Sequence, residues 1–211
     1  MKTPRWTGPL GVAAVVVYLL TTAAGSLLDP RYAQLHQHVS DLTATGAPTR
    51  ATLAPPYLLY NLLALGFAWG LYLGSDRGRW ERVGFGLLTL NAFAGVMMVF
   101  PFAEDLGGAP TTLLGKGHVA FASVSSLAIV VGSFVFGVAF RKRGWRATGR
   151  FSSAVGAAYL VLGPLAVAAT AARTYAGLAE RGPIGLFLLW LLVVGVRAWR
   201  SAAAPTASRA A

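Results

Sequence analysis

The chain has 211 residues, of which 55% are hydrophobic and only 12% are charged. Charged residues make up roughly 25% of a typical soluble domain, so this composition excludes a soluble globular protein and predicts a membrane protein. The sequence contains no cysteine, which excludes disulfides, thiolate metal sites and cysteine nucleophiles. The net charge of +11 does not indicate nucleic-acid binding, because the basic residues separate hydrophobic runs and do not form a folded basic face.

Six apolar runs are each close to the ~20 residues that cross a bilayer as a helix. They span approximately Leu10–Leu28, Leu53–Leu73, Val83–Phe100, His118–Phe140, Phe151–Ala172 and Pro183–Trp199. The first run is longer than the apolar core of a signal peptide, so we expect it to be retained as a helix. The predicted fold class is therefore all-α, with one integral membrane domain of six transmembrane helices over residues 1–200. The tail at 201–211 is small, polar and broken by proline, and is expected to be disordered.

The distribution of lysine and arginine predicts the orientation of these helices. Of the 18 basic residues, 13 lie in the N-terminal segment, the second and fourth loops and the C-terminal segment, and 5 lie in the other loops. Because cytoplasmic loops are enriched in Lys and Arg, both termini are expected in the cytoplasm, in a multi-pass protein of the cell membrane. Five of the seven acidic residues and all three histidines then fall on the extracytoplasmic side.

The loop between the first two runs carries the densest group of reactive side chains. His36, His38, Ser40 and Asp41 lie there within six residues. If the helices pack with short connections, polar residues at the ends of other spans approach this loop at the same membrane depth. The predicted pocket on the extracytoplasmic side comprises His38, Ser40, Asp41, Asp105, His118 and Arg173.

Each of these residues also has a purely structural interpretation. Ser40 and Asp41 belong to the residue types that cap a short helix. His118 fits an interfacial histidine in contact with water, and Asp105 and Lys116 fit an exposed ion pair worth about 0 to 1 kcal/mol. The functional interpretation depends on these residues lying close together in the fold, because no single residue is diagnostic of a function.

Polar residues and glycines inside the runs predict helix contacts. Asn61 and Asn91 lie within the second and third runs and are expected to hydrogen-bond between helices. Gly66, Gly70 and Gly74 repeat every four residues and form a close-approach face. Packing within the chain is the favoured use of this face, and a homo-oligomer is the alternative.

Motifs for several reaction classes are absent. The sequence has no GxxxxGK[ST] phosphate loop, no HExxH, no GxSxG and no GxGxxG after a strand. No acidic residue lies in the middle of a span, so the usual marker of ion-coupled transport is missing. His38, Asp105 and His118 are residue types that ligate zinc, but the fixed local spacings of zinc motifs are missing.

Short motifs in a fixed order along the chain carry a family resemblance. They are Asp29-Pro30, Ser40-Asp41-Leu42, the GAP of Gly46 to Pro48, FPFAED ending at Asp105, His118 at the start of the fourth run, and the GLAER of Gly177 to Arg181. In this respect the chain resembles the membrane family catalogued as domain of unknown function 998 over nearly its whole length. It departs from the family pattern at Thr43, where the family has glycine, and the family's histidine before the serine aligns with His36 or His38. The resemblance implies a bacterial or archaeal six-helix membrane protein with a polar cluster on one side, and it implies no activity.

Three functions are compatible with these residues. The first is a protein that binds a lipid headgroup or small amphiphile in the predicted pocket, where Arg173 would pair with a phosphate or carboxylate. The second is a membrane-embedded hydrolase in which His38, Asp105 and His118 hold a divalent metal such as zinc, and Asp41 or Ser40 assists a bound water. The third is a structural membrane subunit without a ligand site. The sequence assigns no catalytic residue.

Overall fold

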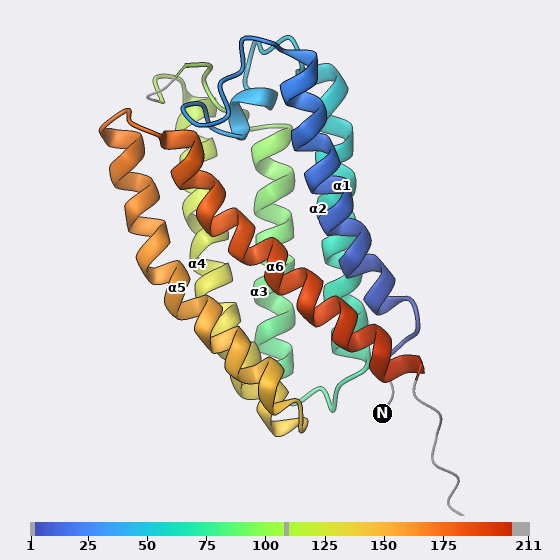
Figure 1. Ribbon diagram of the computed structural model, residues 1–211. Helices are drawn as coiled ribbons and strands as arrows, with labels where there is room; N and C mark the ends of the chain where they lie inside the picture. The colour runs from blue at the N-terminus through green and yellow to red at the C-terminus, as the bar shows by residue number, and fades with distance from the viewer. Residues whose placement is uncertain (1–2, 108–109, 204–211) are drawn as a thin grey trace, which may run out of the picture.

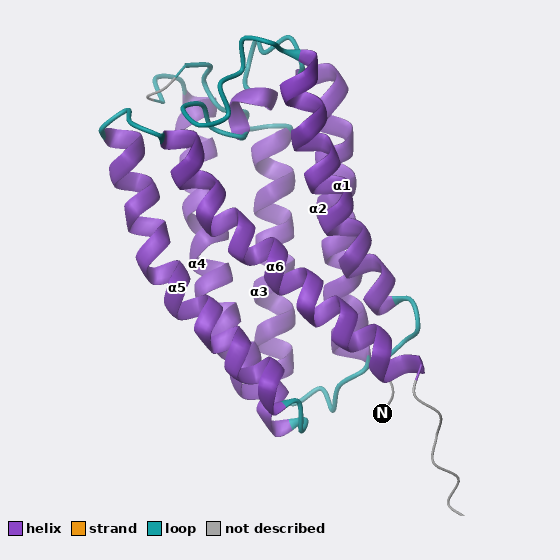
Figure 2. Cartoon of the chain, viewed as in Figure 1, coloured by secondary structure: helices purple, strands orange, loops and turns teal. Residues whose placement is uncertain are grey.

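Six long helices make up the protein, in agreement with the predicted fold class. The computed structural model describes residues 3–107 and 110–203, and within these ranges the regular structure is helical apart from one isolated bridge between Thr45 and Asp105 (Figures 1 and 2). The elements are α1 (Thr7–Leu28), the short 3-10 helix η1 (Ser40–Thr43), α2 (Arg50–Leu73), α3 (Arg79–Val99), α4 (Leu113–Lys142), α5 (Arg146–Ala171) and α6 (Ala176–Ala203). All six α-helices are long and apolar enough to cross a membrane, so the chain is a six-helix membrane protein.

The helices close into a ring. Each helix packs against its neighbours in the chain, and α6 also packs against α1. In Figure 1, α6 crosses the front of the bundle diagonally from the loop after α5 to the start of α1. One face of every helix therefore points to a shared interior.

The two ends of the bundle differ in chemistry. We call the end that holds loops 29–49, 100–112 and 172–175 the histidine end, because His36, His38 and His118 lie there. The opposite end holds both ends of the described chain and loops 74–78 and 143–145, and we call it the arginine end (Figure 1). The two sets of loops distinguished by their basic residues thus lie at opposite ends of one bundle.

Aromatic side chains fill the interior toward the arginine end. Trp190 is 1% exposed and its indole N–H donates to Ser152 Oγ over 2.9 Å. Its ring stacks on Phe187 with centroids 6.0 Å apart, and Phe136 lies 5.2 Å away. Because buried aromatic rings bring large apolar areas and the indole donor has a partner, this half of the bundle is a packed core.

The glycine face of α2 packs against the N-terminal segment of the same chain. A Cβ at Gly74 would lie 2.6 Å from Thr3 Cα, and one at Gly66 would lie 2.9 Å from Leu10 Cδ1. Gly70 faces Thr7 in the same way. The absence of side chains at these positions lets the N-terminal segment and α1 approach α2 closely, so the glycine face packs against residues of the same chain.

All six helices begin three to seven residues before the predicted apolar runs, and the early starts of α4 and α6 matter for the site. Helix α4 starts at Leu113, because the Thr112 hydroxyl caps it by accepting the Gly115 N–H over 3.0 Å. Helix α6 starts at Ala176 and continues through Pro183. Glu180 therefore lies on the first turns of a helix and not in a loop. At the other end α6 includes residues 201–203, and the rest of the predicted tail, 204–211, lies outside the described residues.

Candidate functional site

A cavity of about 290 Å³ occupies the bundle interior toward the histidine end. All six helices and the first loop contribute to its wall. Its lining is mostly apolar and aromatic, with polar groups at the end where Ser40, His118 and Glu180 lie and with Asn61, Asn91 and Ser125 deeper in the bundle. A largely apolar cavity with a few polar groups at one end has the general character of a small-ligand site.

The first loop closes the cavity at the histidine end and is tied to α6. Arg181 donates to the Gln34 carbonyl over 2.6 Å and to the Tyr32 hydroxyl over 2.6 Å. Tyr32 in turn donates to the His38 carbonyl over 2.8 Å. Burial raises the pKa of Tyr32 to about 12, so this hydroxyl stays a donor at neutral pH. The loop is therefore a fixed lid whose backbone is held by charge-assisted hydrogen bonds.

His38 connects this lid to two other elements. Its Nδ1 lies 3.4 Å from Glu104 Oε1, and its Nε2 lies 3.1 Å from the Thr170 hydroxyl. The Thr170 hydroxyl donates its own proton to the Ala166 carbonyl, so it accepts from Nε2–H. With Nδ1–H facing a carboxylate, both ring nitrogens carry protons and the ring is an imidazolium. The interaction with Glu104 raises the pKa of His38 to about 9, against the opposing effect of burial.

Glu104 is the carboxylate partner that the sequence did not single out. It is 9% exposed, and its backbone carbonyl accepts the Thr45 N–H over 2.8 Å. Burial opposes its ionisation, but hydrogen bonding to His38 and Ser40 and the nearby His118 and His38 charges together outweigh burial and hold the pKa of Glu104 below its usual value. Its second oxygen, Oε2, is buried without a hydrogen-bond partner within the described residues.

Asp41 and Ser40 lie on η1, directly above the cavity. Asp41 Oδ2 accepts the His38 backbone N–H over 2.9 Å, which fixes the turn that leads into η1. Burial raises the pKa of Asp41, and the nearby Glu104 charge adds to this effect. Ser40 lines the cavity, whereas Asp41 lines a separate hollow on the outer side of the loop. The pair predicted from the sequence is therefore divided between the two faces of the lid.

His118 lies one turn inside α4 and lines the cavity. It is 9% exposed, and its Nδ1 lies 3.0 Å from the Phe102 carbonyl. A carbonyl only accepts, so Nδ1 carries a proton, and in the neutral ring Nε2 is left with a free lone pair. His118 thus joins α4 to the segment after α3 and offers a hydrogen-bond acceptor.

Asp105 faces away from this group and is bound to the start of α4. Its carboxylate accepts the backbone N–H groups of Thr111 and Thr112, each over 2.8 Å, and the Thr112 hydroxyl over 2.6 Å. The hydrogen bonds from Thr112 and Thr111 lower the pKa of Asp105 to about 2. Its contacts are those of a helix cap.

Arg173 and His36 lie on the surface of the histidine end. Arg173 is exposed in the loop between α5 and α6, with a positive φ of 54°, and does not line the cavity. His36 is also exposed and stacks on Tyr175 with ring centroids 5.1 Å apart. Within residues 3–107 and 110–203, no group of three or more His, Asp and Glu side chains is arranged to hold a metal ion. The structure thus brings together His38, Ser40 and His118 with Glu104 and Glu180.

Glu180 completes the polar end of the cavity. Its Oε2 accepts the Val39 N–H over 2.5 Å, and the side chain lines the cavity. If the sixth helix had been predicted to begin at GLAER, Glu180 would have been placed on a helix facing the bundle and counted among the site residues.

Asn91 was expected to hydrogen-bond between helices, and its Oδ1 accepts the Ser125 hydroxyl of α4 over 2.7 Å. Asn61 instead donates to Tyr57 O of its own helix.

One side of the cavity reaches the surface between α4 and α5. Toward the arginine end these helices touch, since a Cβ at Gly156 would lie 3.0 Å from Phe134. Val167 lies three helical turns beyond Gly156 on the same side of α5, lines the cavity and is 71% exposed. In Figure 1 the ribbons of α4 and α5 lie farther apart at the histidine end than at the arginine end.

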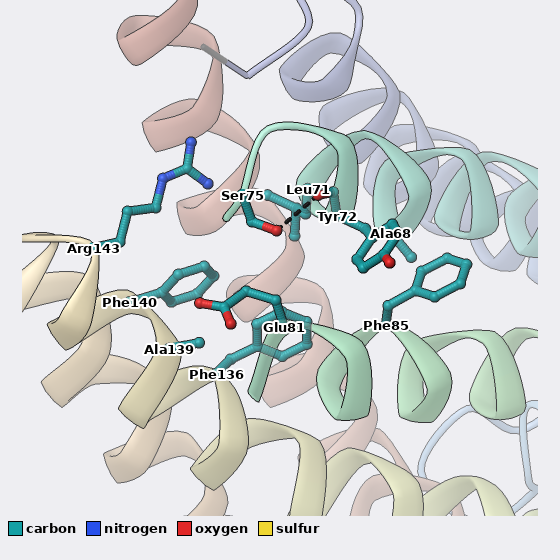
Figure 3. A pocket seen from close by; sticks show the side chains of 10 residues that line it. All are labelled: Ala68, Leu71, Tyr72, Ser75, Glu81, Phe85, Phe136, Ala139, Phe140 and Arg143. Atoms are coloured by element: carbon teal, nitrogen blue, oxygen red, sulfur yellow. Dashed lines mark hydrogen bonds between the residues drawn. The ribbon is translucent and has the colours of Figure 1, made fainter. Parts of the chain in front are cut away.

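A second hollow lies toward the arginine end and is much smaller. Figure 3 shows its lining, with Tyr72 and Phe85 on one side, Phe140 on the other, the Glu81 side chain between them and Arg143 at the edge. Its volume of about 10 Å³ is room for about one water molecule. It is too small for an organic ligand. Hollows of about 290 Å³ at the first loop and about 420 Å³ at the arginine end also lie outside the apolar interior, and the cavity that all six helices line is taken as the candidate site.

Comparison with known proteins places this architecture in a family. The family model described as "Protein of unknown function (DUF998)" matches residues 12–197 of the chain. No curated protein and no solved structure matches the chain. The match includes part or all of each of the six helices, and it confirms the resemblance carried by the sequence motifs.

Proposed function

The chain belongs to the DUF998 family, whose description names no activity, and from its cavity we propose that it binds a membrane amphiphile inside the helix bundle. The headgroup would lie between Ser40, His118 and Glu180, and the hydrocarbon chain would extend toward Ile129 and Phe187. The cavity itself is the observation that carries this proposal, because a packed six-helix scaffold needs no such space at its centre.

The size and polarity of the cavity support a small or single-chain amphiphile. Ligand sites usually have volumes of roughly 300 to 1,000 Å³, and about 290 Å³ is at the lower limit of that range. Polar groups at one end and apolar walls elsewhere match a molecule with a headgroup and a tail. The core of aromatic rings around Trp190 closes the other end and sets a limit on tail length.

The opening between α4 and α5 supports entry from the bilayer. Val167 lines the cavity and is apolar and 71% exposed, as expected for a side chain in contact with lipid. An amphiphile could pass between the two helices with its headgroup held near the membrane surface. The excess of lysine and arginine at the arginine end supports a cytoplasmic position for that end in the cell membrane, and the ligand would then come from the outer leaflet.

Photolabelling with an alkyl alcohol that carries a diazirine on its chain tests this function. In the protein reconstituted into lipid nanodiscs, mass spectrometry should find the label on inward residues such as Met98 and Ile129. Gly163→Leu should abolish that labelling, because Gly163 lines the cavity and its nearest neighbour, Tyr159, would be 3.8 Å from a new Cβ. Gly185→Leu is the matched control, since nothing lies within 4 Å of a Cβ there. Equal labelling of inward residues in both variants would disprove the proposal.

A further inference from the structure

We infer that the headgroup of this amphiphile is a cation, such as a primary ammonium, and that Glu180 recognises it; this inference rests on the proposed function. Glu180 is the single acidic side chain in the wall of the cavity among the described residues. The same wall contains no lysine or arginine. A ligand entering this space therefore meets a carboxylate and no basic residue opposite it.

The carboxylate of Glu180 is incompletely neutralised. Among the described residues, the ion pairs within 4.0 Å are Arg31 with Asp29 and His38 with Glu104, and neither includes Glu180. Within residues 3–107 and 110–203, its side chain accepts one hydrogen bond, from the Val39 backbone N–H to Oε2. The other carboxylate oxygen is available to a ligand, because a carboxylate accepts up to about four hydrogen bonds.

The neighbouring cations are committed to other groups. Arg181 adjoins Glu180 in sequence, yet its guanidinium donates to the carbonyls of Gln34 and Gly177 and to the Tyr32 hydroxyl. The His38 ring is directed to Glu104 and Thr170. These two cations moderate the field around Glu180 but make no ion pair with it. A buried carboxylate without a paired charge is costly, and a bound cation would offset that cost.

The other polar groups at this end are also suited to a donor. The protonated Nδ1 of His118 leaves Nε2 as an acceptor in the neutral ring, and the Ser40 hydroxyl can accept as well. An ammonium has three N–H donors and no acceptor, which matches three acceptors from η1, α4 and α6. An anionic headgroup would instead be repelled by Glu180, and the exposed Arg173 and Lys116 do not line the cavity to attract it.

Competition against the photolabel compares three headgroups on one tail. Dodecylamine, dodecanol and dodecanoate should each be titrated against diazirine-alcohol labelling in nanodiscs at pH 7. In the wild-type protein we expect dodecylamine to compete at about tenfold lower concentration than dodecanol, because hydrogen bonds between charged groups are about twice as strong as neutral ones. Dodecanoate should be the weakest competitor. Glu180→Gln should bring the amine and the alcohol to equal potency.

Two comparisons keep the inference separate from folding defects and from the proposed function. Glutamine at 180 can still accept the Val39 N–H, and Glu81→Gln at the arginine end is the matched control that should keep the tenfold advantage. Equal potency of amine and alcohol in the wild type, or an unchanged advantage in Glu180→Gln, would overturn the cationic headgroup while leaving the cavity function in place. If the alcohol itself never labels inward residues, both the function and the headgroup assignment are wrong.

Discussion

Nδ1 of His38 lies 3.4 Å from Oε1 of Glu104, and this ion pair joins the first loop to the segment that follows α3. The two side chains are 16% and 11% exposed, so the pair is largely shielded from solvent. Because the first loop is also bound to α6 through Arg181, the ion pair links three parts of the chain above the cavity. Its protonation state should therefore control how firmly the lid is held.

The stability of the protein should fall on the alkaline side as His38 loses its proton. The pKa of His38 is raised on folding from its ordinary value of ~6.5 to about 9. A raised pKa stabilises the folded state fully below the unfolded value, and this contribution is lost as the pH rises through about 9. Thermal unfolding of wild type and His38→Gln between pH 6 and pH 10 should show a difference of about 1 to 3 kcal/mol at pH 6 that shrinks toward pH 10.

The control for this prediction is His36→Gln. His36 is exposed and stacks on Tyr175, so its replacement should leave the pH profile unchanged. A constant difference between wild type and His38→Gln across the whole range would contradict an ionised His38.

The Asp105 carboxylate should affect stability through the start of α4 and should not affect ligand binding. Replacing Asp105 with alanine removes the acceptor of the Thr111 and Thr112 backbone N–H groups, so the unfolding midpoint should fall by a few degrees. Asp105→Asn keeps one acceptor oxygen and should lose less. Because the pKa of Asp105 is lowered to about 2, the effect should be the same at pH 5 and pH 8. A loss of photolabelling inside the cavity in either variant would instead give Asp105 a place in the site.

The glycine face of α2 should be sensitive to a single methyl group. Gly74→Ala places a Cβ about 2.6 Å from the Thr3 backbone, and relief of this overlap should cost about 1 to 3 kcal/mol of unfolding free energy. Gly86→Ala on α3 is the matched control, because a Cβ there meets nothing within 4 Å. Thermal unfolding measures the cost, and light scattering on the purified protein measures its mass. A change of oligomeric state without a change of stability in Gly74→Ala would show that this face binds a second copy.

Cysteine labelling should establish the orientation, and the natural chain offers no background because it has no cysteine. Thr174 and Ala147 are exposed at the histidine end and the arginine end, respectively. In intact cells a membrane-impermeant maleimide should label Thr174→Cys, and it should label Ala147→Cys only after permeabilisation, because the basic loops are expected inside. The reverse pattern would place the cavity opening in the inner leaflet.

Much of the architecture follows from local properties of the sequence. A run of about 20 apolar residues has no stable position except across a bilayer as a helix, so six runs predict six helices without tertiary information. The basic residues are equally local, and the loops that contain most of them do lie at one end of the bundle. Thr112 is a residue type that caps helices, and this local feature would have extended the helix that was predicted to begin at His118.

The composition of the site depended on tertiary structure. Glu104 and Asp105 are adjacent acids in FPFAED, and nothing local says which one turns inward. The backbone of Asp105 pairs with Thr45, and its carboxylate binds the start of α4. The Glu104 side chain therefore points the other way and forms the ion pair with His38. The sequence prediction named Asp105 as the site residue, whereas the tertiary contacts make Glu104 the acid that pairs with His38.

The sequence by itself determined that the chain is a six-helix membrane protein, that its basic and histidine-rich loops alternate along the chain, and that it has the motifs of the DUF998 family. Tertiary structure decided that the helices close into a ring with an open interior, and that Glu180 and His118 face that interior while Arg173 does not. The reason is physical: hydrophobicity and charge act residue by residue on the partition between lipid and water, whereas a cavity exists only through the joint packing of all six helices.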